Sequence, residues 1–522
     1  MKKIFIYDST LRDGAQAQGI SFSVEDKLKI VEALDKIGID YIEAGNPGSN
    51  PKDLEFFERV KKLQIKNSKL VSFGSTRRVG VAVEEDANVK SLLKADTSAV
   101  AIFGKSWDFQ VIEILKTTLD ENLNMIYDTI AYFKKLGKEV IYDAELFFEG
   151  YKSNPEYALK TLKAAFDAGA DSLVLCETTG GSFPDEIREA TARCVKEFNV
   201  QIGIHCHNDS GMAVANSVIA VEAGACQVQG TINGFGERCG NANLCVIIPN
   251  LQLKLGYSCI PQEKLEEITS LSRFVNEIAN VVPDERSPYV GKYAFAHKAG
   301  MHADAISKNP KSYEHIDPEF VGNERTFLMS EVAGRSAVLN LIRNVDDKIT
   351  KDSPETRKIL DRLKELEYQG YQYEGAESSF EIEIRKALGR YTPFFDLREF
   401  KVIVNEPSLE GKNSSAMIKI KVDGEEEITA AEGDGPVNAL DKALRKALER
   451  FYPSIRQMKL TDYKVRVLDS ESATAAKVRV LIESSDGREA WTTIGVSTDI
   501  IDASWKALVD SIEYKLLKEK GL

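Results

Sequence analysis

The most restrictive feature of this sequence is a repeated alternation of short β-rich runs and amphipathic helical stretches between residue 4 and about residue 237. This alternation is typical of parallel strands joined by crossover helices. Eight strand–helix units are the number that closes a barrel, whereas an open doubly wound sheet usually has fewer strands. The sequence therefore predicts an α/β protein that begins with a (β/α)8 TIM barrel. The expected strands lie at 4–9, 41–45, 70–75, 98–104, 139–147, 172–178, 201–207 and 227–232.

Beyond the barrel, the character of the sequence changes twice. Residues 262–387 have mainly helical patterns, interrupted by the loop-rich stretch PDERSPYVGKYAFAHKAGMHADA. After about residue 390, two similar units each run from strands through a glycine into an amphipathic helix. We therefore expect a catalytic barrel at 1–261, helical linker subdomains with an active-site loop at 262–395, and a duplicated α+β domain at 396–522.

Charge and composition exclude several classes of partner. The net charge is −13, with acidic and basic residues interspersed, which argues against nucleic acid or an anionic membrane as a partner. Only four apolar residues precede Asp8, too few for a secretory signal, and no later run is long enough to span a membrane. The seven cysteines include no CxxC pair. We expect a cytoplasmic protein with reduced thiols.

A candidate metal site lies at the end of the seventh expected strand. His205 and His207 are two residues apart, so a strand directs both imidazoles to the same face, here the barrel interior. Asp13, after the first strand, is the expected carboxylate, and Asn241 is a weaker fourth candidate. Such ligands suit Mg²⁺, Mn²⁺, Co²⁺ or Zn²⁺ and leave positions open for a chelating substrate. The alternative is a pair of core histidines with satisfied hydrogen bonds.

Two further strand ends carry charged residues suited to catalysis. Arg12 precedes Asp13 beside a glycine turn, and a simple strand-end ion pair is the competing interpretation. Glu145 follows Asp143 on the fifth strand, where one carboxylate could be ionised and the other perturbed by its like charge. A solvated carboxylate at the barrel rim is the competing interpretation for Glu145. The glycine-rich NGFGERCGNAN stretch lacks the context of a dinucleotide site and is interpreted as the loop that delivers Asn241.

Four separated motifs resemble a known superfamily in their order along the chain. DSTLRDGAQ, HCHND, NGFGERCGNAN and HKAGMHADA are similar to the DRE-TIM metallolyases, specifically the Claisen-condensing branch of 2-isopropylmalate, homocitrate and citramalate synthases. Five further segments, at 20–30, 41–53, 73–78, 142–152 and 312–325, resemble the citramalate-forming members most closely. The resemblance covers essentially the whole chain. It implies an acyltransferase of isoleucine biosynthesis that joins acetyl-CoA to pyruvate, converting the acyl group into alkyl, and releases citramalate and CoA.

The resemblance also assigns roles to individual residues. It implies a divalent metal ion held by Asp13, His205, His207 and Asn241. It implies catalytic roles for Arg12, Glu145, His302 and Tyr313, and substrate binding by Arg12, Thr178 and Asp304. Arg12 would stabilise the alkoxide that develops on the ketone, and either Glu145 or His302 would remove the proton from acetyl-CoA. A purely structural role for Thr178 would be a strand-end hydroxyl that caps the next turn.

The C-terminal domain resembles the amino-acid-sensing module of this branch, which implies a homodimer and feedback by isoleucine. Two departures stand out: CETTGG replaces the expected CDTNGG, so no role is carried over to Glu177, and Asn46 replaces the usual Trp near the barrel mouth. The main rival function is a synthase for a larger 2-oxo acid, 2-oxoisovalerate or 2-oxoglutarate, because one methylene changes preference by only about 1–3 kcal/mol. The sequence also leaves open a related acyl-CoA lyase and a non-catalytic amino-acid sensor.

Overall fold

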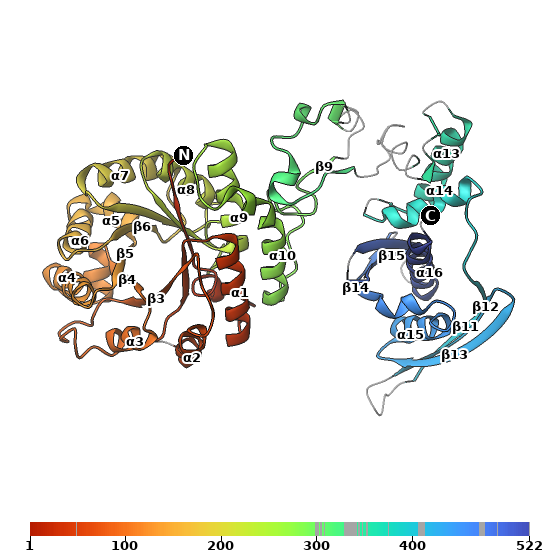
Figure 1. The fold of residues 1–522 in the computed structure, drawn as a ribbon, viewed down its shortest axis with the longest axis horizontal. Coiled ribbons are helices and arrows are strands. Elements are labelled where there is room, and N and C mark those ends of the chain that lie inside the picture. Colours follow the sequence, from red (N-terminus) through yellow and green to blue (C-terminus); the bar gives the residue numbers. More distant parts are fainter. Residues whose placement is uncertain are drawn as a thin grey trace. The chain divides into compact units, whose positions relative to one another are not determined.

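The computed structural model divides the chain into two compact units (Figure 1). One unit comprises Met1–Phe295 and Ile316–Arg325, and the other comprises Ala296–His315 and Thr326–Leu522. The predicted domain boundaries at residues 261 and 395 stay a prediction. The structure describes residues 1–520 except 49, 298–301, 303–304, 307, 328–341, 343–344, 347, 351–352, 374, 406–412, 469–475 and 488. No helix in this described part is long and apolar enough to cross a membrane.

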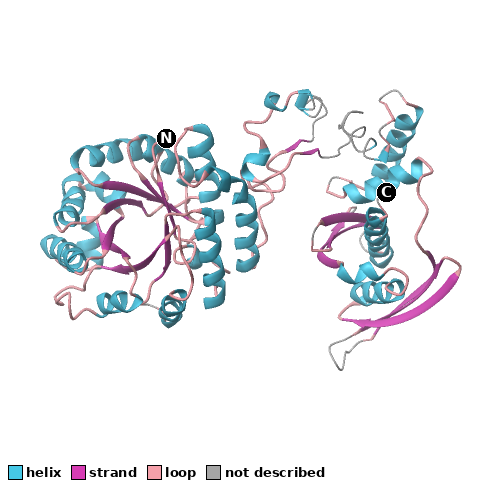
Figure 2. Cartoon of the chain, viewed as in Figure 1, coloured by secondary structure: helices cyan, strands magenta, loops and turns pink. Residues whose placement is uncertain are grey.

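The first unit contains the predicted barrel, in which eight parallel strands pair in sequence order and β1 closes against β8 (Figure 2). The strands are β1 (Phe5–Asp8), β2 (Tyr41–Gly45), β3 (Lys69–Ser75), β4 (Ala99–Lys105), β5 (Glu139–Glu145), β6 (Ser172–Glu177), β7 (Gln201–Cys206) and β8 (Gln227–Gly230). Each overlaps an expected strand, so the predicted fold class is confirmed.

Helices surround the barrel (Figure 2). They are α1 (Val24–Ile37), α2 (Pro51–Val60), α3 (Ala87–Ala95), α4 (Leu119–Lys135), α5 (Phe147–Ser153), α6 (Pro155–Asp167), α7 (Pro184–Glu197), α8 (Ala213–Glu222), α9 (Leu244–Pro249) and α10 (Ile268–Ala279). Helix α1 shows how local sequence sets these limits. Ser23 and Asp26 form a reciprocal capping box at its start, and Gly38 ends it with a left-handed φ of 90°.

The inward row of side chains changes character along the barrel axis. Its lower part is apolar, with Tyr7, Tyr41, Val71, Ala101 and Ile141 packed together. Because side chains alternate between the two faces of a strand, the next inward positions can be identified from this set. Towards the carboxyl ends they become polar: Glu43, Lys105, Asp143, Glu145, His205 and Gln229. The barrel therefore presents its charged residues at the end where such folds carry their active sites.

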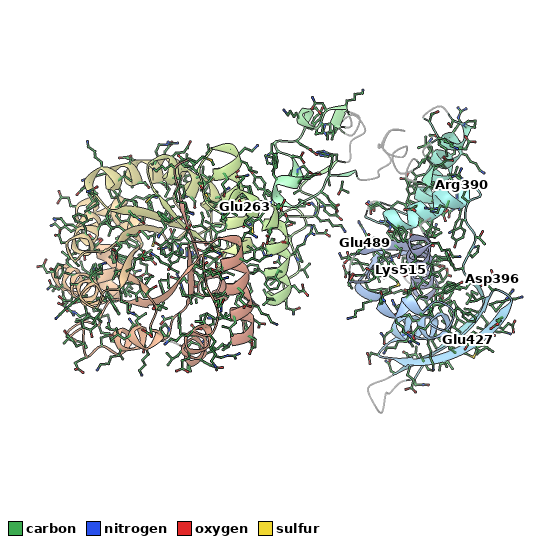
Figure 3. All side chains as sticks on the ribbon, viewed as in Figure 1. Glu263, Arg390, Asp396, Glu427, Glu489 and Lys515 are labelled. Carbon is green, nitrogen blue, oxygen red and sulfur yellow. The ribbon has the colours of Figure 1, made fainter. Side chains whose placement is uncertain are left out.

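The second unit contains the predicted duplicated α+β arrangement. Its sheets are β11 (Asp396–Val404), β12 (Ser414–Val422) and β13 (Glu425–Gly433), then β14 (Lys459–Val467), β15 (Val478–Ser485) and β16 (Ala490–Ser497), both antiparallel. Helix α15 (Pro436–Leu448) follows the first sheet and α16 (Ile500–Glu519) the second, with one shared core. Earlier elements are β9 (Ala296–His297), β10 (Thr326–Phe327), α13 (Pro354–Gln369) and α14 (Glu377–Ala387). Lys515, labelled in Figure 3, joins α16 to Asp486 at 2.5 Å.

Candidate active site

Asp13, His205 and His207 come together at the carboxyl end of the barrel. All three are buried, and one ligand atom from each lies within 4.8 Å of the others. The two histidine Nε2 atoms are 3.4 Å apart, and Asp13 Oδ2 lies 3.4 Å from that of His205 and 3.9 Å from that of His207. The i, i+2 spacing on β7 therefore directs both rings towards the same carboxylate, as predicted. This donor set fits one divalent ion.

Gln229 and Asp143 orient His205 within the metal trio, the name used below for Asp13, His205 and His207. Its Nδ1 lies 3.0 Å from Gln229 Oε1, and Gln229 Nε2 donates to Asp143 Oδ1 at 3.0 Å. With the amide oxygen facing Nδ1, the proton of the neutral imidazole resides on Nδ1, and Nε2 is then left with a lone pair for a metal ion. Sequence reasoning missed Gln229, although a buried glutamine at an inward position of β8 is an identifiable signal.

Asn241 lies next to His207, with which it forms an isolated antiparallel bridge. Its side chain is buried; Nδ2 donates to Phe235 O at 3.3 Å, while Oδ1 has no hydrogen-bond partner among the described residues. An unpartnered buried amide oxygen is costly, and a metal ion would satisfy it. This observation supports the fit of Asn241 as a fourth ligand.

The charge states of the trio suit metal binding in part. Burial disfavours the Asp13 carboxylate, but Arg12 and His205 outweigh this effect and hold its pKa well below the usual range. Burial and the neighbouring His205 lower the pKa of His207 to about 4, so this imidazole is neutral. Despite burial, the hydrogen bond that the protonated His205 ring donates to Asp13, together with the charge of that carboxylate, raises the pKa of His205. A proton and a metal ion therefore compete for the His205 nitrogen.

Arg12 is fixed by a buried carboxylate that sequence reasoning missed. Its Nε donates to Glu43 Oε2 at 2.5 Å, its Nη1 lies 3.2 Å from Asp13 Oδ2, and its guanidinium covers the Phe73 ring at 3.8 Å. Glu43 is fully buried and also accepts hydrogen bonds from Tyr7 and Ser9. The signal was an acidic residue inside the otherwise apolar run YIEAG of β2.

The carboxylate that perturbs Asp143 is not the one that the sequence predicted. Burial, followed by the charge of Glu43, raises the pKa of Asp143 to about 7. The prediction paired Asp143 with Glu145 as mutually perturbing carboxylates, but Glu43, from another strand, is the perturbing carboxylate. Sequence proximity was misleading because Asp143 and Glu43 meet only across the closed barrel.

Glu145 ends β5 and pairs with Lys105, whose Nζ lies 2.6 Å from its Oε2. Thr178, which follows β6, accepts a hydrogen bond from the backbone N–H of Leu146 at 2.9 Å. That contact matches the structural role considered for Thr178, while the hydroxyl proton stays available to a substrate carboxylate. Glu177 accepts from the N–H groups of Gly181 and Ser182, so it organises its own loop.

The remaining predicted site residues belong to the second unit. The rings of His302 and Tyr313 stack with centroids 4.0 Å apart, and both side chains are exposed. The structure thus brings these two together, while their role at the barrel site stays a prediction. Asp304 lies outside the described residues.

A pocket opens beside Arg12, between the connections that follow β1 and β2. Asn46, the departure from the expected Trp, lines this pocket, and its backbone N–H donates to Asp53 Oδ2 at 2.9 Å. Its lining residues are Leu11, Arg12, Ala15, Gln16, Ile20, Ser21, Phe22, Lys27, Asn46, Asn50, Lys52, Asp53 and Phe73. The smaller side chain at position 46 therefore lies next to space that adjoins the candidate site.

Comparisons with known proteins agree over the whole chain. Residues 3–275 match the HMGL-like family, 289–370 the homocitrate synthase post-HMGL domain-like family, and 374–516 the LeuA allosteric (dimerisation) domain. The (R)-citramalate synthase of Aquifex aeolicus is 54% identical over 99% of this chain and 99% of that protein. The (R)-citramalate synthase of Geobacter sulfurreducens is 53% identical over 100% of this chain and 99% of that protein. A probable 2-isopropylmalate synthase of Methanopyrus kandleri is 33% identical over 98% of each.

Proposed function

Because the chain belongs to the (R)-citramalate synthase family, we propose that it joins acetyl-CoA to pyruvate and hydrolyses the thioester to release citramalate and CoA. This is an acyl transfer in which the acyl group becomes alkyl, in the cytoplasm and in the service of isoleucine biosynthesis. The observation that carries the proposal is the convergence of Asp13, His205 and His207 beside Arg12 at the barrel mouth.

Asp13, His205, His207 and Asn241 would hold a divalent ion, Mn²⁺, Mg²⁺, Co²⁺ or Zn²⁺. The buried, unpartnered Asn241 Oδ1 and the neutral His207 imidazole support this assignment. When bound, such an ion supplies a Lewis acid for a 2-oxo acid carbonyl. The protein contributes buried donors from the end of β7 and from the connections that follow β1 and β8.

Arg12 stabilises the negative charge that develops on the carbonyl oxygen of pyruvate. A guanidinium held in advance by Glu43 and Asp13 needs little reorganisation during the reaction, which is the basis of electrostatic stabilisation. Thr178 and Asp304 bind the substrate, with the Thr178 hydroxyl donating to the pyruvate carboxylate.

The proton on the acetyl methyl group requires a base. Glu145 and His302 are the candidates, since both are side chains that can accept a proton. Tyr313 stacks on His302, and we assign it a catalytic role beside that histidine. The resulting carbanion carbon attacks the pyruvate ketone, and water then cleaves the thioester.

The C-terminal repeats carry regulation in this proposal. Residues 374–516 match an allosteric dimerisation domain. We assign them homodimer formation and feedback inhibition by isoleucine. Regulation of this kind couples binding of the end product to the affinity or rate at the barrel.

The first test measures CoA release from acetyl-CoA with pyruvate, 2-oxobutyrate, 2-oxoisovalerate and 2-oxoglutarate. We expect release with pyruvate strongly preferred, loss with EDTA, and recovery when Mn²⁺ or Mg²⁺ is restored. Preference for a bulkier acid would keep the reaction and change the product. No release with any of the four acids would contradict the proposal and favour a lyase or a sensor.

A further inference from the structure

Lys105 forms an ion pair with Glu145, and the proposed reaction gives Lys105 itself no role. Lys105 is the last residue of β4, Glu145 the last of β5, and the two are register partners in the sheet. The Nζ to Oε2 distance is 2.6 Å, and the side chains are only 19% and 27% exposed. Both occupy the inward row, so the pair lies in the barrel mouth.

The backbone that carries Glu145 is held from both sides. The N–H of Ser106, the residue after Lys105, donates to Glu145 O at 3.0 Å. On the other side, the N–H of Leu146 donates to the Thr178 hydroxyl at 2.9 Å. Leu146 adopts a left-handed φ of 58°, which leucine avoids unless its surroundings impose it. The ends of β4 and β6 thus fix the position from which the Glu145 side chain projects.

Three further groups lie close to the Glu145 carboxylate. Asp143 occupies the next inward position of β5, and the thiol of Cys176 also feels the charges of both carboxylates. Lys105 is the cation that pairs with Glu145 within the described part of the chain. The Lys105 ammonium, 2.6 Å from Oε2, attracts the Glu145 carboxylate and favours the rotamers that direct it towards β4.

We propose that Lys105 is a positioning residue of the condensation reaction, which holds the Glu145 carboxylate in one orientation facing the substrates. The inference deepens the proposed function and rests on it, because Glu145 is one of its two candidate bases. Lys105 acts through Glu145 and does not itself touch substrate. A geometric error of about 1 Å at a reacting group can cost on the order of a hundredfold in rate, so orientation alone is a sufficient role.

The same strand provides a matched control. Glu139, the first residue of β5, pairs with Lys69, the first residue of β3, at 2.5 Å. Both pairs join a lysine to a glutamate of β5, but Lys69 and Glu139 lie at the amino end, away from the site. A purely structural role predicts that Lys105→Met, like Lys69→Met, leaves kcat and KM of the folded enzyme unchanged, whereas positioning predicts a loss of activity only for Lys105→Met.

The experiment measures kcat and KM for pyruvate and acetyl-CoA in Lys105→Met, Lys105→Arg, Lys69→Met, Glu145→Gln and the Lys105→Met/Glu145→Gln double variant. We expect Lys105→Met to lower kcat by at least about tenfold, mostly without a change in KM. Lys105→Arg should recover most of the lost kcat. Lys69→Met should have the same kcat and KM as the unaltered enzyme. The double variant should be no slower than Glu145→Gln, because a residue that acts through another adds nothing once its partner is gone.

Equal activity of the two methionine variants would overturn the proposal. Independent, multiplicative losses in the double variant would also overturn it, since Lys105 would then act on substrate directly. If Glu145→Gln is too slow to compare, rescue by arginine decides the matter. Circular dichroism and thermal midpoints show whether each variant folds. Failure of the proposed function gives a different result, because the unaltered enzyme then releases no CoA. That result would also contradict the positioning role.

Discussion

The barrel mouth and the C-terminal repeats both bury charged side chains, but they satisfy them differently. At the mouth, residues from several strands and their loops converge, and polar atoms such as Asn241 Oδ1 and His207 Nδ1 lack a hydrogen-bond partner among the described residues. In the described part of the repeats, Arg445 Nη2 is the one buried side-chain atom in that condition. There, charges are neutralised locally: Lys515 pairs with Asp486 and Glu519.

The difference separates two uses of buried polar groups. A fully satisfied network secures one arrangement of secondary structure, whereas leftover ligand atoms indicate a group that binds from outside. The repeats use Lys515 to join α16 to the turn between β15 and β16. The barrel keeps atoms free at the point where donors from different strands meet.

The largest effect should come from breaking the metal trio. His207→Ala is expected to lower kcat by more than about a thousandfold, because it removes one of the three ligands that converge on the site. The fold should survive, since barrel stability resides in the packed interior and not at the mouth. CoA release and circular dichroism check both statements, and retention of most activity would contradict the metal assignment.

Deleting residues 396–522 tests the role of the C-terminal repeats. If effector binding belongs to the repeats, isoleucine should no longer inhibit the shortened enzyme at concentrations that inhibit the full chain. CoA release is measured with increasing isoleucine in both proteins. Inhibition that persists unchanged in the shortened enzyme would place the effector site elsewhere.

Glu43→Gln probes the buried partner of Arg12. We expect kcat to fall about tenfold to a hundredfold, because the guanidinium loses the charge that fixes its orientation. Leaving a buried cation with a neutral partner should also lower the free energy of unfolding, by about 1–3 kcal/mol. Kinetics and urea unfolding separate the two effects. An unchanged kcat would show that Glu43 serves only the fold.

The smallest effect concerns pH and the repeats. Burial raises the pKa of Asp510 to about 6 and that of Glu513 to about 7. Each folded carboxyl therefore binds a proton more tightly than its unfolded form, so the contribution to stability is present below the unfolded values of 3.8 and 4.5 and is lost as pH rises to about 7.

This loss should amount to about 3 kcal/mol for Asp510 over the whole range and should be absent in Asp510→Asn. Urea unfolding between pH 4 and 7 can be followed by tryptophan fluorescence, since Trp491 and Trp505 report on the repeats and Trp107 on the barrel. A repeat transition that does not weaken over this range would contradict the shift. The barrel transition serves as the internal reference.

Most of the fold could be predicted because its signals are local. Alternating β-rich and helical runs identified all eight barrel strands, and the strand–glycine–helix pattern identified the repeats. The metal trio was also predictable, since His205 and His207 share one strand and Asp13 follows another at the same end. The partners of these residues were not predicted: Glu43 for Arg12, Lys105 for Glu145 and Gln229 for His205.

The order of strands, the end of the barrel that carries the polar residues and the residue types of the candidate metal site could all be predicted from the sequence alone. These follow from periodicity and spacing within single segments. Which charges interact depends on the folded barrel, because Glu43 and Asp143 are 100 positions apart in the sequence and approach each other through its closure. Register between strands sets those contacts, and register depends on packing of the whole interior and not on any one segment.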